Sequence, residues 1–200
     1  MSIKIETVGL FGISDFGIGF LKNLINSKYK ISFVTSKSKP VLHALNLENE
    51  LKNICNKNRI QYLGNVDANT PNIIKKSASV DLCILGGYDK ILKKEILSAP
   101  KHGFINTHLG IIPENRGCNP SMWAILNNIQ QGATTYFVNE KIDKGSIIDI
   151  QKLEDNSLNS YDAYQALSQK VSDNIISCIE KIEREDPFME SKGRERYQSH

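Results

Sequence analysis

Two polar side chains, Asn106 and His108, stand two positions apart in the segment GFINTHLGIIPENRG, residues 103–117. If this segment forms a strand, both side chains face the same side, because alternate residues of a strand point the same way. An amide donor beside an imidazole can hold an oxyanion, and the imidazole can also move a proton. The competing interpretation is an Asn that caps a turn and a His that makes a structural hydrogen bond.

Asp143 is the candidate for a third member of this group. It lies in EKIDKGSII, between two β-rich segments, where a surface turn residue is the alternative. Together the three side chains suit acyl transfer: Asn and His stabilise the charge on a tetrahedral carbon, and Asp holds the His or an ordered water that relays a proton. Because no Ser or Cys is placed as a nucleophile, the attacking group should belong to the substrate.

The elements that must position these residues alternate between strand and helix patterns. Expected strands are IETVGLFGI, KISFVTS, RIQYLG, SVDLCILGGY and HGFINTHLG, followed by the paired ATTYFVNE and GSIIDIQKLE. Between them, helical spacing or a capping residue before proline predicts helices over FGIGFLKNLINS, LENELKNICNKN, TPNIIKKSA, KKEILSA, NPSMWAILNN and SYDAYQALSQKVSDNIISCIEKIE. This order predicts an α/β fold with an open, mostly parallel Rossmann-like sheet and helices on both faces.

Open parallel sheets bind ligands at the carboxyl ends of their strands, where FINTH ends. We expect one catalytic domain over residues 1–185 and a polar tail over 186–200. In the helix after FINTH, Asn119 should cap the first turn, and Trp123, Ile125 and Leu126 are expected in the core.

Composition narrows the class of protein. A net charge of +3 on 200 residues is far from the basic footprint of a nucleic-acid binder. The four cysteines lie far apart, so neither a metal site nor a disulfide framework is expected. We therefore expect a cytoplasmic protein without a membrane segment, a metal or a nucleic-acid partner, and a homodimer stays open because the last helix could pack on a second subunit.

The segments DLCILGGYDKILKKEILSAPKHGFINTHLGIIPENRG and GATTYFVNEKIDKGSIIDIQKLE resemble the formyltransferase fold family, which uses 10-formyltetrahydrofolate. The likeness runs from about residue 80 to 153, with a weaker match at LFGISDFGIGFLKNL. It is greatest to the sugar-amine formyltransferases and to the catalytic domain of methionyl-tRNA formyltransferase. The resemblance implies that Asn106, His108 and Asp143 form the catalytic triad.

The resemblance also implies where the folate co-substrate would bind. The loop GGYDKIL and the loop around Asp143 should line its pocket, with apolar walls from side chains and with backbone groups reading the pterin edge. The implied residues are Gly87, Tyr88, Lys90, Ile91, Leu92 and Ile142. An ordinary helix start is the alternative for YDKIL. By the same resemblance, the bond between Ile112 and Pro113 is a candidate cis peptide.

Two departures from the family pattern concern the acceptor. Leu109 and Gly110 stand where the family usually has Pro and Ser, so Gly110 would admit a bulky substrate or relax the turn. Tyr136 stands where many members have His, and its phenol can donate a hydrogen bond but cannot titrate near neutral pH.

The acceptor follows by elimination. Arg116 could bind a phosphate or stand as a solvated loop cation, and Gly110 and Asn119 would complete the acceptor site. The 200-residue length and the charge argue against a methionyl-tRNA enzyme, and the missing Gly-Ser phosphate loop argues against glycinamide ribonucleotide formyltransferase. A nucleotide-linked amino sugar is therefore the expected acceptor, with glycinamide ribonucleotide as the alternative within the family. A non-catalytic folate or nucleotide binder and a formyl hydrolase are the alternatives of another class.

Overall fold

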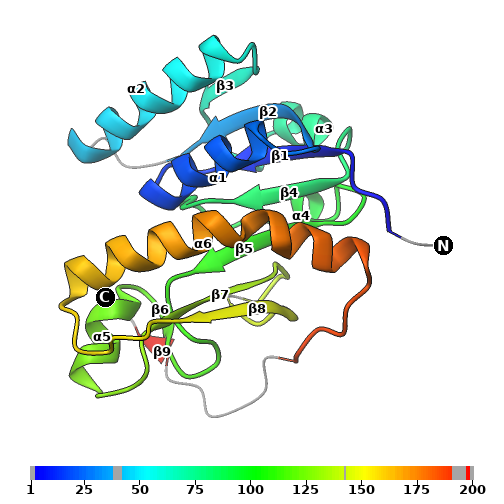
Figure 1. Ribbon diagram of the computed structural model, residues 1–200. Helices are drawn as coiled ribbons and strands as arrows, with labels where there is room; N and C mark the ends of the chain where they lie inside the picture. The colour runs from blue at the N-terminus through cyan, green and yellow to red at the C-terminus, as the bar shows by residue number, and fades with distance from the viewer. Residues whose placement is uncertain (1–2, 38–41, 142, 191–196, 199–200) are drawn as a thin grey trace.

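The computed structural model describes residues 3–37, 42–141, 143–190 and 197–198, and its elements alternate as the sequence predicts (Figure 1). In chain order they are β1 (Thr7–Phe11), α1 (Asp15–Ile25), β2 (Lys30–Ser36), α2 (Leu42–Lys57), β3 (Tyr62–Asn65), α3 (Pro71–Ser77), β4 (Leu82–Leu85), α4 (Lys94–Leu97), β5 (Phe104–His108), β6 (Arg116–Gly117), α5 (Pro120–Leu126), β7 (Gly132–Phe137), β8 (Ile147–Lys152), α6 (Ser160–Glu183) and β9 (Tyr197–Gln198).

One seven-stranded sheet organises the protein, in the order β3-β2-β1-β4-β5-β7-β8. The strands from β3 to β5 pair in parallel, whereas β7 runs antiparallel to both of its neighbours. Residues 116–117 and 197–198 form a second, two-stranded parallel sheet that the sequence did not predict. The predicted α/β fold with an open, mostly parallel sheet is confirmed.

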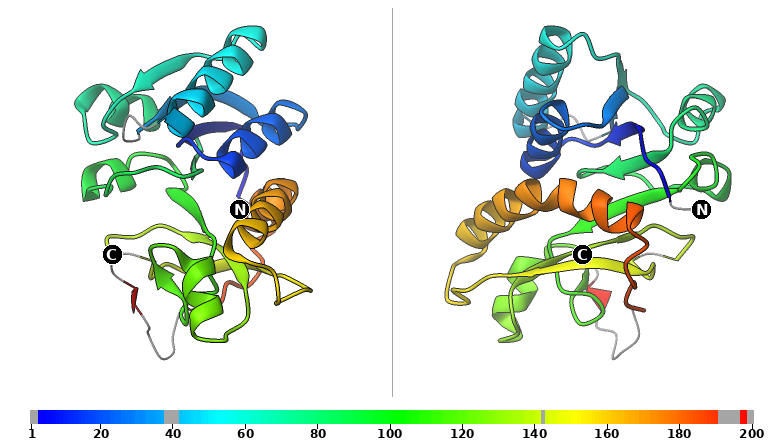
Figure 2. Two further views of the ribbon diagram at one scale, coloured as in Figure 1. Left: turned by 90° about the vertical axis from the view of Figure 1, so that its left-hand side faces the viewer. Right: turned by 45° about the vertical axis from the view of Figure 1, so that its right-hand side comes forward.

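Helices cover both faces of the main sheet, as predicted. In Figures 1 and 2, α1, α2 and α6 lie on one face, and α3 and α4 lie on the other. Two buried clusters match this division: one joins the sheet to α1, α2 and α6 through residues such as Leu21, Leu51 and Ile175. The other joins the sheet to α3 and α4 through Ile73 and Ile96. Burial of both faces explains why the central strand β4, LCIL, is a continuous apolar run whose four residues are all buried.

Helix starts follow their sequence signals. Pro71 and Pro120 occupy the first turns of α3 and α5, where a missing N–H is no loss. Asn119 takes the capping position, although its side chain makes no capping bond and its φ is 51°. α2 begins at Leu42, earlier than predicted.

The apolar face of α5 departs from the prediction. Ile125 is 43% exposed and Leu126 is 66% exposed, and Trp123 is half-buried. The expectation that this group belongs to the core is therefore wrong for Ile125 and Leu126. The helix lies beyond the end of β5 and packs only one side against α6 (Figure 1), so helical spacing marks a face that the fold leaves uncovered.

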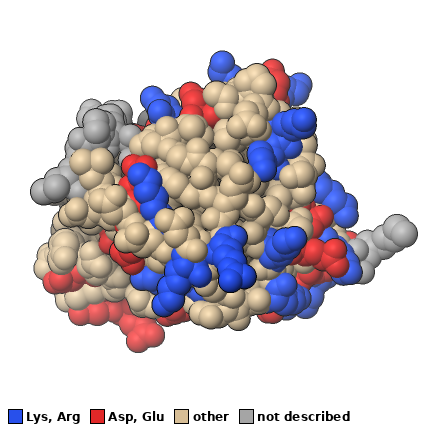
Figure 3. Space-filling model, turned by 90° about the horizontal axis from the view of Figure 1, so that it is seen from above, with Lys and Arg blue, Asp and Glu red and all other residues tan. Residues whose placement is uncertain are grey.

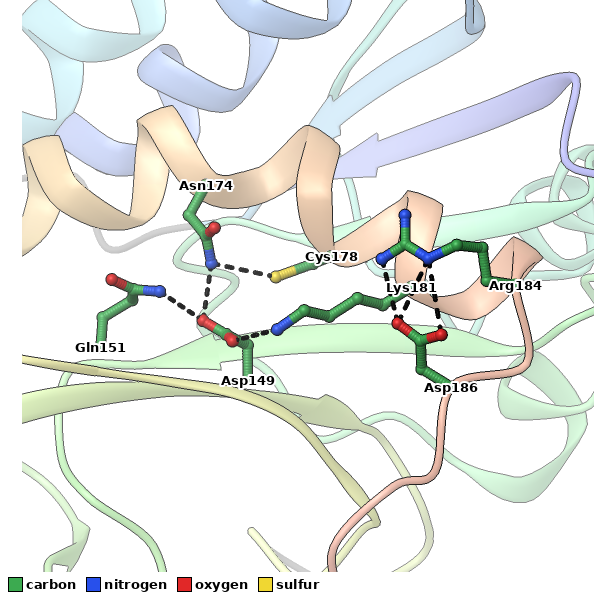
Figure 4. Close-up of polar contacts among 7 residues, drawn as sticks. All are labelled: Asp149, Gln151, Asn174, Cys178, Lys181, Arg184 and Asp186. Atoms are coloured by element: carbon green, nitrogen blue, oxygen red, sulfur yellow. Dashed lines mark hydrogen bonds and ion pairs between the residues drawn. The ribbon is translucent and has the colours of Figure 1, made fainter.

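A polar cluster fastens α6 to the edge strand β8. The Asp149 carboxylate accepts hydrogen bonds from Asn174, at 2.7 Å, and from Gln151, and it pairs with the Lys181 ammonium group (Figure 4). Asn174 also contacts the Cys178 thiol. Because the carboxylate is mostly buried and receives three donors, this cluster holds the helix in register with the strand.

On the face shown in Figure 3, basic and acidic side chains are interspersed, as is typical of a solvated surface. Over the described part of the chain, no helix is both long and apolar enough to cross a membrane.

Candidate active site

Asn106 and His108 lie on β5 and are both partly buried. Antiparallel pairing with β7 sets Asn106 opposite Tyr136 and His108 opposite Thr134. The alternation predicted for FINTH holds: Ile105 is fully buried on the other side of the strand. The two polar residues therefore share one face at the carboxyl end of β5, where an open sheet of this kind presents its ligand site.

Tyr136 connects Asn106 to Asp143. The Asn106 amide Nδ2 donates to the Tyr136 hydroxyl at 2.7 Å, and that hydroxyl donates to Asp143 Oδ1 at 2.6 Å. Burial, followed by the charge of Asp143, raises the pKa of the Tyr136 phenol well above its usual value. The phenol thus stays protonated near neutral pH and transmits a hydrogen bond from the strand to the loop.

The loop that carries Asp143 is held by backbone geometry. Asp143 has a φ of 53°, and a side chain at Gly145 would collide with the carbonyl group of Phe137. Arg116 Nε donates to the Asp143 carbonyl oxygen at 2.8 Å, and the Gly117 amide lies 3.4 Å from Asp143 Oδ2. Support from β6 therefore fixes both the backbone and the carboxylate of Asp143.

His108 is held from a different direction. Its Nε2 lies 2.8 Å from the carbonyl oxygen of Asn115, and because a carbonyl only accepts, Nε2 is the donor. Nδ1 remains for a substrate. Among the described residues no direct bond joins Asp143 to His108, so of the two arrangements considered from the sequence, Asp143 does not hold the ring.

In the turn after β5, the backbone of Gly110 lies close to the Asn115 carbonyl oxygen and to the His108 ring. A side chain on Gly110 would meet the Asn115 carbonyl oxygen at 2.4 Å and His108 Nε2 at 2.7 Å. Gly110 is thus required by the bond that orients His108, and its role in admitting a substrate stays a prediction. The Ile112–Pro113 bond is cis, which confirms that expectation.

A cavity of about 520 Å³ opens beside His108. It lies among β5 and the starts of α1, α5 and α6, and its lining residues are Phe16, Thr107, His108, Leu109, Asn119, Pro120, Ser121, Met122, Ser160 and Tyr164. None of these is Lys, Arg, Asp or Glu. A molecule in this cavity would meet apolar walls, hydroxyl groups and one amide next to the imidazole.

Of the acceptor residues expected from the sequence, Asn119 lines this cavity and Arg116 does not. Arg116 is only 1% exposed, so its interpretation as a solvated loop cation is wrong. The reason is the bond from its Nε to the Asp143 carbonyl oxygen. Phosphate binding by Arg116 stays a prediction.

The expected folate loop runs irregularly from Gly86 to α4, so the helix start considered for it is wrong. Tyr88 packs on Phe11, and its hydroxyl accepts from the Ala68 amide at 2.6 Å and donates to the Val66 carbonyl group at 3.0 Å. Burial raises its pKa to about 12. Tyr88 therefore ties the loop to the segment after β3.

The other residues of this loop differ in exposure. Ile91 is 72% exposed, whereas Leu92 is 8% exposed and belongs to the core cluster with Ile96. Lys90 is exposed and Gly87 has a φ of 78°. Ile142 lies outside the described residues. Ile91 therefore projects an apolar side chain into solvent while its carbonyl oxygen accepts from the Asn69 amide, and its contact with a folate stays a prediction.

Sequence reasoning missed the roles of two residues. Asn115 supplies the carbonyl group that orients His108, and its side-chain Nδ2 donates a hydrogen bond to the Pro120 carbonyl oxygen. Tyr136 departs from the family pattern in the sequence, but its hydrogen bond to Asn106 depends on the register between β5 and β7, which the sequence does not reveal.

The sequence matches the Formyl transferase family over residues 16–177. The chain belongs to this family. The methionyl-tRNA formyltransferase of Thermodesulfovibrio yellowstonii is 36% identical over 183 residues, which cover 87% of this chain and 58% of that protein. The chain thus spans a little over half the length of this curated relative. The family membership predicted from the motif segments is confirmed.

Solved structures share the fold. A 4-N formyltransferase from Francisella tularensis superposes with a TM-score of 0.74 at 22% identity and covers 96% of this chain and 76% of its own. A phosphoribosylglycinamide formyltransferase from Anaplasma phagocytophilum superposes with a TM-score of 0.73 at 18% identity, over 97% of this chain and 98% of its own. This protein therefore has the formyltransferase fold.

Proposed function

We propose that this protein transfers a formyl group from 10-formyltetrahydrofolate to the primary amine of an acceptor bound beside His108. The observation that carries the proposal is the hydrogen-bonded series Asn106–Tyr136–Asp143 together with the oriented His108 ring, which lies two positions from Asn106 on the same face of β5. No side-chain nucleophile is needed, because the amine itself attacks.

In the proposed reaction, the amine nitrogen bonds to the formyl carbon, and the carbonyl electrons move to oxygen. The free N–H of Asn106 donates to that oxyanion. His108 donates through Nδ1 in its imidazolium form, because Nε2 already carries the proton that is bound to the Asn115 carbonyl oxygen. Asp143 assists removal of the proton that the attacking nitrogen loses. When the oxyanion collapses, the bond from the carbon to N10 breaks, N10 gains a proton, and tetrahydrofolate leaves.

The co-substrate would bind along the loop of residues 86–92, with Ile91 as an apolar wall. Gly87, Tyr88, Lys90 and Leu92 would shape this loop, together with Ile142 on the loop that carries Asp143. We also propose that residues 1–185 act as one catalytic domain with 186–200 as its tail.

For the acceptor, we favour an amino sugar linked to a nucleotide. The support is the cavity beside His108, whose uncharged lining suits a sugar ring with hydroxyl groups near the reacting amine. Gly110, Arg116 and Asn119 would then belong to the acceptor side. The second candidate is methionyl-tRNA, on the likeness to the relative from Thermodesulfovibrio yellowstonii.

The test is release of tetrahydrofolate from 10-formyltetrahydrofolate, followed by absorbance with a panel of acceptors. The panel holds thymidine-, guanosine- and uridine-linked amino sugars, glycinamide ribonucleotide and methionyl-tRNA, with water alone as the control. Turnover with one amino sugar alone supports the proposal. Turnover with methionyl-tRNA or glycinamide ribonucleotide reassigns the acceptor, formate release without any amine indicates a hydrolase, and silence with every amine contradicts transfer.

A further inference from the structure

We infer that Tyr136 is a positioning residue of this site: its hydroxyl group orients the Asn106 amide toward the formyl oxygen and holds Asp143 in place. The inference rests on the proposed function, and the contacts of the phenol carry it. Tyr136 itself need not touch the substrate, because it acts through the two groups on either side of it.

The direction of each hydrogen bond follows from proton count. A phenol has one proton, and an ionised carboxylate only accepts. The proton of Tyr136 therefore points to Asp143 Oδ1, at 2.6 Å. The phenol oxygen must then accept the bond from Asn106, at 2.7 Å. As a result one N–H of the Asn106 amide is occupied and the other is available to an oxyanion.

The phenol can do this because its own position is tightly determined. Tyr136 is 3% exposed and packs with Ile112 and Ile147. Its ring belongs to β7, and its hydroxyl spans from β5 to the β7–β8 loop, which meets Arg116 on the other side. Without the hydroxyl, the Asn106 amide could rotate about its last bond, and the available donor would leave the formyl oxygen.

A purely structural role is the competing explanation, and Tyr29 provides the matched control. Tyr29 is also 3% exposed, and its hydroxyl also donates to a carboxylate, Glu183, at 2.9 Å. It precedes β2, at the amino ends of the strands and therefore away from Asn106. Removing either hydroxyl leaves a partly buried carboxylate one donor short, but only Tyr136 contacts Asn106 and Asp143.

The experiment compares Tyr136→Phe and Tyr29→Phe with wild type, using the acceptor that supports turnover. We expect Tyr136→Phe to lower kcat by about 10- to 100-fold with KM for the folate changed less than about 3-fold, since orientation of an oxyanion donor acts on the transition state. Tyr29→Phe should keep kcat within about 2-fold, although it too loses thermal stability, because its hydroxyl no longer donates to the Glu183 carboxylate. Equal kcat values for the two variants overturn the inference.

A second measurement does not depend on turnover. With ¹⁵N-labelled asparagine, one side-chain amide proton of Asn106 should exchange slowly in wild type and in Tyr29→Phe, and quickly in Tyr136→Phe. Slow exchange in all three proteins contradicts the inference even if Tyr136→Phe is unstable. If wild type shows no transfer to any amine, the proposed function fails, whereas the exchange result still decides whether Tyr136 orients Asn106.

Discussion

Asp143 and Asp149 lie in the same β7–β8 hairpin, yet their carboxylates have different surroundings. Asp149 is on the strand, beneath α6, and accepts from three side chains of regular elements, among them Lys181 (Figure 4). Asp143 is on the loop, in a left-handed backbone conformation, and accepts from Tyr136. The Asp149 carboxylate therefore belongs to a cluster that joins α6 to β8 (the Asp149 cluster). The Asp143 carboxylate is instead connected through the Tyr136 hydroxyl to the Asn106 amide, which keeps one N–H available.

The difference separates stability from activity. Donors that converge on Asp149 fasten a helix to an edge strand, so their loss should cost folding free energy. Under the proposed function, the donors around Asp143 place groups for the reaction, so their loss should cost turnover. The following predictions test this separation, from the largest expected effect to the smallest.

The largest effect on turnover is expected at Asn106 and His108, the two proposed donors to the oxyanion. Asn106→Ala and His108→Ala should each lower kcat by at least about 100-fold, because each removes a donor to the oxyanion. Thermal unfolding of both variants should stay close to wild type, since both side chains are only partly buried. Near-normal turnover in both variants would remove the basis of the proposed chemistry.

In the Asp149 cluster, Lys181→Met should lower the free energy of unfolding by about 1–3 kcal/mol. The Asp149 side chain is 12% exposed and loses its cation, although Lys181 itself is 30% exposed and the loss is partly screened. The free energy can be measured by urea unfolding. Unchanged stability, or a kcat loss comparable to that of His108→Ala, would contradict the assignment of Asp149 to stability and Asp143 to turnover.

Alkaline pH should weaken the same cluster. Burial, followed by the charge of Asp149, raises the pKa of the Cys178 thiol to about 12. An unfolded thiol ionises near pH 8.5, so the contribution of Cys178 is complete below that pH and is lost as pH rises toward 12. The unfolding free energy of wild type should therefore fall relative to Cys178→Ala by at most about 1.4 kcal/mol per pH unit above pH 9. A pH-independent difference between the two proteins would contradict this.

The smallest effect is expected at the exposed folate loop. Ile91→Ala should raise KM for 10-formyltetrahydrofolate by about 3- to 10-fold, because it removes apolar surface that the co-substrate would cover. Stability should change by less than about 0.5 kcal/mol, as for other exposed positions. Leu45→Ala, at a 46% exposed position of α2, is the matched control and should leave KM unchanged.

Local patterns predicted the parts of the protein that local physics decides. Alternation in β5 placed Asn106 and His108 on one face, and proline at the first turn marked the starts of α3 and α5. Contacts between distant segments decided the rest. The exposed Leu126 depends on where α5 sits, and the bonds of Tyr136 depend on the β5–β7 register, neither of which is encoded by spacing within one segment.

The most direct test measures kcat and thermal unfolding in parallel for Asp143→Asn and Asp149→Asn. Both variants remove one negative charge from the same hairpin with little change in shape. The account predicts at least about 100-fold lower kcat with near-normal unfolding for Asp143→Asn, and lower stability with kcat within about 2-fold for Asp149→Asn. Normal turnover in Asp143→Asn, or the same loss of turnover in both, would contradict the assignment of Asp143 to formyl transfer.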